Sequence, residues 1–214
     1  MAQKSAGQSL LENSYDLSTP EDNRAYYDAL AQSYDSGFVK ELGYSYPLIV
    51  AAINRREAGV EDVPVLDVGC GTGIVAEGLG LPAEAIDGID ISPEMLKLAD
   101  AKNVYRRLID ADLTKSLDHL GDTYGAVVSA GTFTHGHLGP EPLGKLLGVA
   151  RRGALFVIGI NERHYAAHGF AETLAALESA GRIGGLKSER RPIYDKAGHD
   201  HSGDHAFIMQ YRKA

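Results

Sequence analysis

Cysteine, tryptophan and long apolar runs are scarce or missing in this chain of 214 residues. The single cysteine, Cys70, cannot form a disulfide within the chain, and a lone cysteine is common in the reducing cytosol. No stretch approaches the roughly 20 apolar residues that span a bilayer, and Lys4 is not followed by the apolar core of a signal peptide. We therefore expect a soluble, cytoplasmic protein with no membrane partner.

The chain also lacks an excess of positive charge. It has 21 Lys and Arg against 29 Asp and Glu, a formal net charge of −8. Such a balance gives no general attraction to phosphate backbones, which argues against nucleic acid as a partner. The apolar content of 44% is too high for a disordered chain and is enough to bury the core of one domain.

The organisation along the chain changes near residue 20. Residues 1–20 are polar and rich in Ser, which predicts a mobile tail. We expect one domain over residues 21–214. Within residues 21–57, aromatic and apolar side chains recur at helical spacing, which predicts helices ahead of the main sheet, interrupted near Pro47. Residues 63–212 would form the core of the domain.

Beyond residue 60, short apolar runs alternate with helical patterns, which is typical of an α/β protein with a mostly parallel sheet. We expect seven strands, at Val63–Val68, Ala85–Ile89, Val104–Ile109, Ala126–Ala130, Ala154–Ile160, Leu186–Ile193 and Ala206–Tyr211. Helices are expected between them at Ile74–Leu79, Pro93–Lys102, Leu143–Arg151 and Arg163–Ala180. A polar loop separates the last two strands, so we expect these to pair as an antiparallel hairpin at one edge.

The turn after the first expected strand carries the clearest signal. Glycine stands at alternate positions, Gly69, Gly71 and Gly73, where positive φ is accessible and the backbone can approach a ligand closely. The dinucleotide-binding pattern needs its third glycine where this sequence has Ile74, which argues against NAD. The carboxylate of Asp67, before the first glycine, suits a ligand that carries an ammonium group.

Two further carboxylates follow the next two expected strands. Asp90 ends the second strand, where a carboxylate can accept hydrogen bonds from both hydroxyls of a ribose. Asp112 follows the third, where it can accept from an adenine amino group while Leu113 covers the ring. Open α/β sheets bind ligands at the carboxyl ends of their strands, so we expect one shared site. The combined spacing disfavours the alternative of a plain βα turn with solubilising aspartates.

The stretch Leu66–Gly73 resembles the first motif of the class I S-adenosylmethionine-dependent methyltransferases. Gly88–Ser92 and Asp112–Leu113 follow at the spacing that this family shows, and the resemblance extends over roughly residues 22–212. It implies a Rossmann-like, seven-stranded class I methyltransferase sheet of order 3-2-1-4-5-7-6 with strand 7 antiparallel, helices on both faces and N-terminal cap helices. It also implies S-adenosylmethionine as the cofactor.

A narrower resemblance, to the small-molecule group that includes the Williams–Beuren-region methyltransferase-like proteins, rests on Tyr27-Asp28, Tyr34-Asp35 and Thr134–His137. Tyr27 and Tyr34 are seven residues apart and share one helix face, so either could cover the sulfonium of the cofactor or simply pack a helix on the sheet. The residues expected to bind the cofactor are Tyr27, Tyr34, Asp67, Gly69, Cys70, Gly71, Gly73, Asp90, Ile91, Met95, Ala111, Asp112, Leu113, Ser129, Ala130 and Gly131.

Two histidines after the fourth expected strand, His135 and His137, are the candidate catalytic residues. A hydroxyl or ammonium acceptor must lose a proton during methyl transfer, and histidine is the commonest general base. Either imidazole could instead only pack against the cofactor. We expect no metal site, because the cluster His199–His205 lacks a complete ligand motif and is better explained as a solvated hairpin loop.

The resulting hypothesis is methyl transfer to a small-molecule acceptor. Two alternatives remain at this point: a relative that binds the cofactor without turnover, and an NAD-dependent oxidoreductase. The sequence names neither the acceptor nor the oligomeric state.

Overall fold

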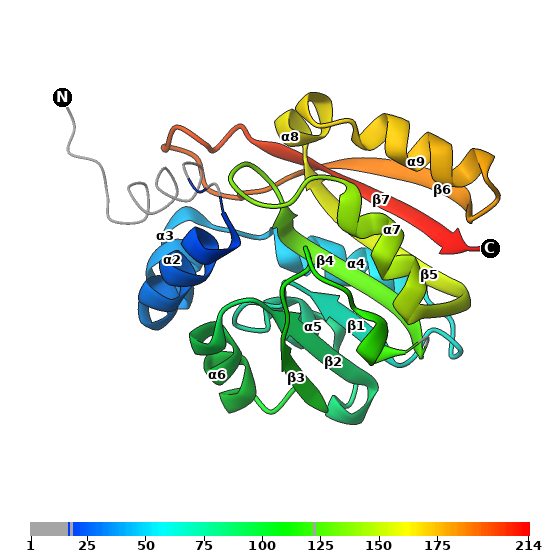
Figure 1. Ribbon diagram of the computed structural model, residues 1–214. Helices are drawn as coiled ribbons and strands as arrows, with labels where there is room; N and C mark the ends of the chain where they lie inside the picture. Colours follow the sequence, from blue (N-terminus) through cyan, green and yellow to red (C-terminus); the bar gives the residue numbers. More distant parts are fainter. Residues whose placement is uncertain (1–16, 18, 122) are drawn as a thin grey trace.

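The computed structural model describes residues 17, 19–121 and 123–214 (Figure 1). The tail expected over residues 1–20 therefore lies almost wholly outside the described residues. The first described helix, α2, runs over Pro20–Ser33, and its start follows from local chemistry. Thr19 and Asp22 form a reciprocal capping box, and Pro20 occupies the first turn, where its missing N–H costs no hydrogen bond.

The seven strands form one sheet of order β3-β2-β1-β4-β5-β7-β6, which confirms the expected topology (Figure 1). The first five strands pair in parallel, and β7 pairs antiparallel with both β5 and β6. The strands are β1 Val65–Val68, β2 Ile86–Asp90, β3 Arg107–Asp110, β4 Tyr124–Phe133, β5 Ala150–Asn161, β6 Ile183–Pro192 and β7 His205–Lys213. The expected strand at Val104 thus starts three residues later, and β4, β5 and β6 start earlier than expected.

Helices lie on both faces of this sheet. They are α4 Tyr46–Glu57, α5 Ile74–Leu79, α6 Pro93–Ala101, α7 Glu141–Val149, α8 Glu162–Ala167 and α9 Phe170–Ser179, with a π-helix at Tyr34–Val39, a short α3 at Lys40–Leu42, and short 3₁₀ turns at Ala83–Ala85 and Asp118–Leu120. One prediction was wrong: the expected helix Arg163–Ala180 is two helices. Gly169 takes a left-handed φ of 70° between them, a conformation that interrupts a right-handed helix.

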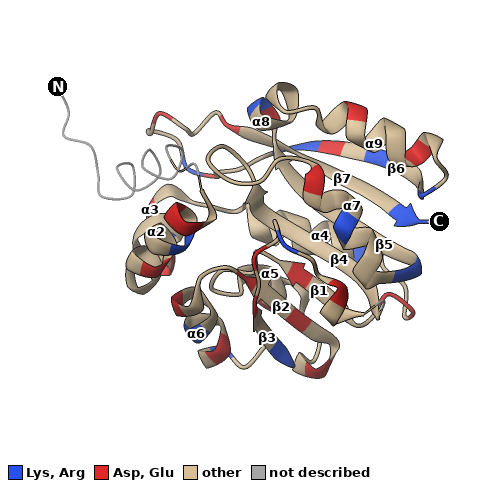
Figure 2. Cartoon of the chain, in the orientation of Figure 1, with Lys and Arg blue, Asp and Glu red and all other residues tan. Residues whose placement is uncertain are grey.

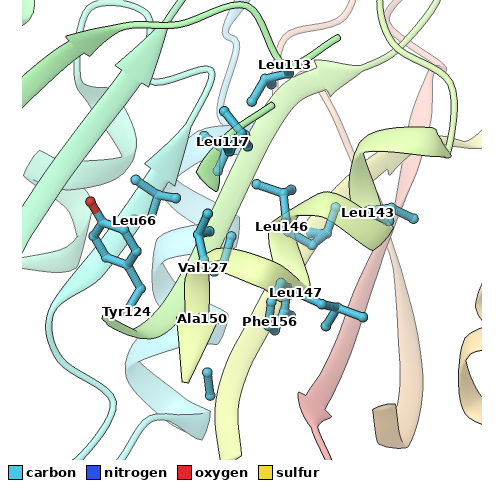
Figure 3. Close-up of a cluster of buried hydrophobic side chains, with 14 of the residues drawn as sticks. Leu66, Leu113, Leu117, Tyr124, Val127, Leu143, Leu146, Leu147, Ala150 and Phe156 are labelled. Atoms are coloured by element: carbon cyan, nitrogen blue, oxygen red, sulfur yellow. The ribbon is translucent and has the colours of Figure 1, made fainter. Parts of the chain in front are cut away.

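Two hydrophobic clusters cover the two faces of the sheet. Because side chains alternate along a strand, Leu66 belongs to the cluster that includes side chains of α7 and α9, while its neighbour Val65 belongs to the cluster that includes α4 and α5. The first cluster includes Val127 of β4 and Phe156 of β5, both fully buried, beneath leucines of α7 (Figure 3). This packing holds the carboxyl ends of β1 to β5 in one row, which is where the site is formed.

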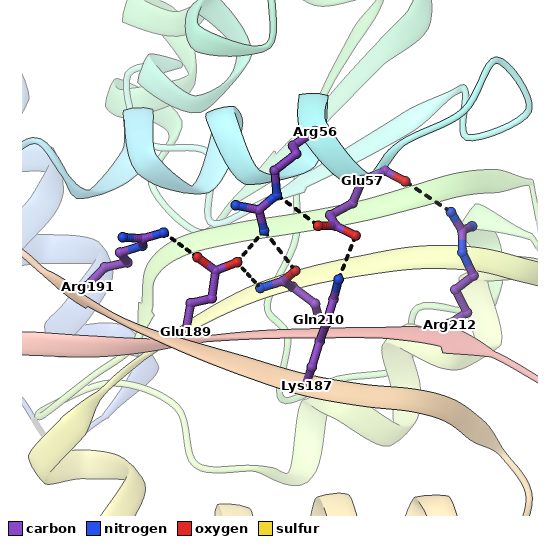
Figure 4. Close-up of polar contacts among 7 residues, drawn as sticks. All are labelled: Arg56, Glu57, Lys187, Glu189, Arg191, Gln210 and Arg212. Atoms are coloured by element: carbon purple, nitrogen blue, oxygen red, sulfur yellow. Dashed lines mark hydrogen bonds and ion pairs between the residues drawn. The ribbon is translucent and has the colours of Figure 1, made fainter.

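A network of charged side chains joins α4 to the outer strands (Figure 4). Glu189 of β6 accepts from Arg56 and from Nε2 of Gln210, at 3.0 Å for the amide, and these partners lower its pKa to about 2. Lys187 donates to Glu57 at 2.7 Å. These partly exposed pairs each contribute little stability, but together they fix α4 across the edge of the sheet.

Charged residues of both signs are interspersed over the elements (Figure 2). Within the part of the chain that the structure describes, no helix combines the length and apolar character needed to cross a membrane.

Candidate active site

A cavity of about 280 Å³ opens at the carboxyl ends of the parallel strands. Its walls come from the ends of β1 to β5, from α2 and the π-helix, and from the segment after β6. Thirteen of the residues expected from the sequence line it: Tyr27, Tyr34, Gly69, Gly71, Asp90, Ile91, Met95, Ala111, Asp112, Leu113, Ala130, Gly131 and His137.

The glycine turn has the backbone that its sequence predicts. Gly69, Gly71 and Gly73 have φ angles of 66°, 53° and 93°, which L side chains rarely adopt. A Cβ on Gly69 would stand 2.0 Å from Oγ1 of Thr132, so no side chain fits there. The turn therefore presents bare backbone to the cavity at Gly69 and Gly71, while Gly73 caps α5.

Asp90 stands at the end of β2 with its carboxylate held by the backbone. Its Oδ2 accepts from the N–H of Gly71 at 2.8 Å, and its Oδ1 accepts from the N–H of Ser92 at 2.9 Å. Burial raises the pKa of this carboxyl, and the two backbone donors offset part of that effect. Each carboxylate oxygen has further acceptor capacity, so the group fits the paired hydroxyls of a ribose.

The end of β3 supplies the next part of the wall. Ala111 and Leu113 are buried and line the cavity, as does Asp112. Oδ1 of Asp112 accepts from the backbone N–H and the hydroxyl of Thr114, at 2.8 and 2.7 Å. Its other oxygen lies 3.9 Å from the Lys115 ammonium, which fits a carboxylate able to take a hydrogen bond from an adenine amino group.

The repeated Tyr-Asp pairs fasten the first helices over this cavity. Oδ1 of Asp28 accepts from the Ser92 hydroxyl at 2.6 Å, and Oδ1 of Asp35 accepts from the Thr72 hydroxyl at 2.6 Å. Tyr27 and Tyr34, the preceding residues, line the cavity, with ring centroids 6.3 Å apart. The seven-residue spacing therefore places two tyrosines in the cavity wall and two carboxylates against the turns that follow β1 and β2.

Tyr27 and His137 form a hydrogen-bonded pair inside the cavity. Nδ1 of His137 lies 2.7 Å from the carbonyl oxygen of His135, which can only accept, so Nδ1 carries the proton. Burial lowers the pKa of His137 to about 4, so the ring is neutral at pH 7 and Nε2 is an acceptor. The Tyr27 hydroxyl, 2.8 Å away, donates to that Nε2.

Five residues expected at the site do not line this cavity: Asp67, Cys70, Gly73, Ser129 and His135. Ser129 is fully buried and donates to the carbonyl of Val68 at 2.8 Å, joining β4 to β1. His135 instead packs beside His164, with ring centroids 5.4 Å apart. Its contribution to the site is its backbone carbonyl, which fixes the tautomer of His137.

Asp67 is fully buried behind the glycine turn. Its Oδ2 accepts from the Tyr105 hydroxyl at 2.7 Å, and its Oδ1 has no partner among the described residues. Burial raises the pKa of Asp67 to about 7, and raises that of the neighbouring thiol of Cys70 well above its usual value. An unpaired buried carboxylate is costly, so this group is a strong acceptor for any positive charge that the turn brings near.

Several cavity residues were missed by the sequence analysis. Phe38, Tyr44, Tyr46 and Tyr194 form a wall of packed rings, in which Tyr44 and Tyr194 are joined by a β-bridge across 150 residues of sequence. Asn161, at the end of β5, also lines the cavity. Nothing local in the sequence shows which of these rings meet.

The histidines of the loop after β6 do not gather with other ligands. Within the described ranges, no group of three or more His, Cys, Asp or Glu could hold a metal ion. His201 instead contacts Asp204, with Nδ1 2.9 Å from Oδ2. Metal independence stays a prediction.

Known methyltransferases are similar to this chain in sequence and in fold. A family profile described as "Methyltransferase domain" matches residues 65–153, from β1 into β5. Methyltransferase-like protein 27 of Homo sapiens is 33% identical over 116 residues, which are 53% of this chain and 47% of that protein. Residues 65–153 thus match a methyltransferase domain, and the sheet has the strand order of the class I methyltransferase fold.

Other relatives agree with this methyltransferase assignment. The ubiquinone biosynthesis O-methyltransferase of Serratia proteamaculans is 40% identical over 63 residues, 29% of this chain and 26% of that enzyme. The chain matches about half or less of the length of these two curated relatives. Magnesium protoporphyrin IX methyltransferase from Synechocystis PCC 6803, solved with bound SAH, shares the fold with a TM-score of 0.65 at 15% identity, covering 91% of this chain and 99% of that one.

Proposed function

We propose that this methyltransferase domain moves the methyl group of S-adenosylmethionine to a small-molecule acceptor, with Tyr27 and His137 taking the proton that the acceptor loses. The observation that carries the proposal is the continuity of one cavity. It reaches from the backbone-held carboxylate of Asp90 to the Tyr27–His137 pair without leaving the carboxyl edge of the sheet.

The cofactor would occupy the half of the cavity above β1, β2 and β3. There Asp90 would accept from the ribose hydroxyls, Asp112 from the adenine amino group, and Leu113 and Met95 would cover the ring. The aromatic face of Tyr34 would lie toward the sulfonium, which attracts aromatic rings. Bound in this way, the cofactor supplies a methyl group already activated on positively charged sulfur.

The protein would then contribute alignment and a path for one proton. Holding reacting groups in line inside an enclosed site can contribute about 7–11 kcal/mol. The Tyr27 oxygen can take the proton of the acceptor while its own proton passes to Nε2 of His137, a direction that the observed hydrogen bond already sets. A base with a pKa of about 4 takes up a proton less readily than one near 7, so we expect alignment to dominate the rate.

The size and charge of the cavity support a small acceptor. The described residues that line it include neither Lys nor Arg, so the walls offer nothing to a phosphate backbone. Together with the net charge of −8, this favours a small molecule over a nucleic acid.

Two measurements test the proposal in sequence. Calorimetric titration should show binding of S-adenosylhomocysteine, the demethylated product, and no binding of NAD. Transfer of label from methyl-labelled S-adenosylmethionine to pooled small hydroxyl and amine compounds should then reveal turnover. Binding without transfer to any pool would favour a protein that only binds the cofactor, and tight binding of NAD would overturn the assignment.

A further inference from the structure

Asn161 presents a fixed hydrogen-bond donor to the half of the cavity that the cofactor does not need. The residue ends β5 and caps α8, where its Oδ1 accepts from the backbone N–H groups of Arg163 and His164 at 3.0 and 3.2 Å. Backbone amides only donate, so the oxygen must face the helix and Nδ2 must point away from it. Asn161 is 4% exposed and lines the cavity, and Nδ2 donates to no described residue.

The described part of the cavity wall around this donor carries no balancing charge. Among the described residues of the cavity wall, the only carboxylates are Asp90 and Asp112, at the ends of β2 and β3. Asn161 lies on the far side of β1 and β4 from them, because the strand order is β3-β2-β1-β4-β5. Phe133 and Tyr194 line this half of the cavity, and His137 is neutral.

An ionised ligand should therefore bind weakly in this half of the cavity. Burying a carboxylate or an ammonium group without an opposite charge is far more costly than burying a neutral polar group that keeps one hydrogen bond. A ring packs well against Phe133 and Tyr194, and an oxygen on that ring can accept from Nδ2 of Asn161.

We propose that Asn161 determines acceptor specificity: its Nδ2 donates to an oxygen of an uncharged ring compound that carries the hydroxyl to be methylated. The inference rests on the proposed function, because it concerns the acceptor end of that same cavity. It makes Asn161 a binding residue for the acceptor, in addition to a helix cap.

The replacement Asn161→Asp separates these two roles. Asp caps helices as well as Asn does and accepts from the same two amides, so the start of α8 should be kept. The outward atom becomes an acceptor with negative charge where the ligand oxygen needs a donor. Asn161→Ser is a second variant that keeps a cap but shortens the side chain, and exposed Asn103→Asp controls for the added charge alone.

Three para-substituted phenols serve as probes of different charge: 4-hydroxyacetophenone is neutral, 4-hydroxybenzoate is an anion and tyramine is a cation. Their binding to the protein saturated with S-adenosylhomocysteine can be measured by calorimetry, without any turnover. The native protein should bind the neutral probe at least tenfold tighter than either ion. In Asn161→Asp, the neutral probe should weaken about tenfold and tyramine should tighten, while Asn103→Asp stays at the native values.

The outcomes separate this inference from the proposed function. Equal binding of the three probes, no binding of any, or an unchanged neutral probe in both Asn161→Asp and Asn161→Ser would overturn the specificity role. Failure of S-adenosylhomocysteine to bind would count against the proposed function. In that case, the order of affinities for the three probes, measured in the absence of S-adenosylhomocysteine, would still decide the role of Asn161.

Discussion

At the scale of single residues, the site depends on hydrogen bonds that leave one side of each group available. Asp90 is held by two backbone donors on the protein side. His137 is held through Nδ1, so its Nε2 faces Tyr27. In both groups, contacts from backbone atoms set the orientation: Asp90 keeps acceptor capacity for a ligand, and His137 keeps its Nε2 for the Tyr27 hydroxyl.

Replacing Asp90 by Ala should weaken binding of S-adenosylhomocysteine by about 10- to 100-fold, because the ribose hydroxyls lose their acceptors at a cost of roughly 1–3 kcal/mol. Calorimetry measures the change directly. Asp100→Ala, at an exposed position of α6, is the matched control and should bind as the native protein does. Native affinity in a folded Asp90→Ala protein would show that the ribose does not bind at β2.

The Tyr27–His137 pair should behave as one unit. Tyr27→Phe and His137→Ala should each keep cofactor affinity and lower the rate of methyl transfer by about 10- to 100-fold, and the double variant should be little worse than either. The rates can be measured with an acceptor found in the pooled assay. Exposed His119→Ala should leave the rate unchanged. Additive losses would mean that the two residues act separately.

A spectroscopic readout needs no acceptor. Burial lowers the pKa of His137 to about 4. A hydroxyl that donates to the neutral imidazole favours that form, so we expect the Tyr27 hydrogen bond to add to this effect. In Tyr27→Phe this donor is gone, and an NMR titration of the His137 ring should show a pKa closer to its usual value near 6.5. An unchanged pKa would show that burial alone sets it.

At the scale of elements, α2 and the π-helix close the cavity mainly through polar contacts. Asn23 donates to the carbonyl of Gly136 at 2.9 Å, and Arg24 pairs with Asp110 at 2.8 Å. A π-turn inside a helix often marks a functional position, and here it lies where Tyr34 enters the cavity. Such a segment can detach at a modest free-energy cost, since few buried apolar side chains hold it.

Removing the two carboxylates that fasten this segment should loosen it. In Asp28→Ala/Asp35→Ala the hydroxyls of Ser92 and Thr72 lose their acceptors, each worth roughly 1.5–3 kcal/mol as a bond to a charged group. Hydrogen exchange over residues 20–39 should speed up by at least about tenfold. Gln32→Ala, exposed on the same helix, is the control. Native exchange in the double variant would show that apolar packing alone holds the segment.

At the scale of the whole molecule, Asp67 couples the site to stability. Its pKa is about 7 in the folded protein and near 3.9 in the unfolded chain, so the folded state holds a proton that the unfolded chain releases between these values. The corresponding stability is complete below about pH 4 and is lost as the pH rises through about 7.

Asp67→Asn should remove this pH dependence. The neutral amide needs no proton, so the variant should melt at a higher temperature than the native protein at pH 8, and this advantage should be clearly smaller at pH 5. Each kcal/mol recovered corresponds to about 2–4 °C for a chain of this size. Thermal unfolding at the two pH values, with exposed Asp100→Asn as the control, provides the measurement. Parallel native and variant curves would show that Asp67 does not titrate in this range.

By itself, the sequence determined what depends on neighbouring residues: the glycine turn, the carboxylate of Asp90 at a strand end, and the strand order that follows from βα alternation and the family resemblance. Positive φ, helix capping and strand periodicity act over a few residues, so a linear pattern records them. The sequence did not predict the break between α8 and α9 at Gly169, because the apolar pattern continues across it.

Only the tertiary structure decided which side chains meet. Tyr27 and His137 are 110 residues apart and touch because α2 lies against the loop that follows β4. The tertiary structure also turned Asp67 away from the cavity and His135 toward His164, and it aimed the amide of Asn161 inward. These outcomes depend on how elements distant in sequence pack together, and no spacing along the chain encodes the direction in which a loop side chain finally points.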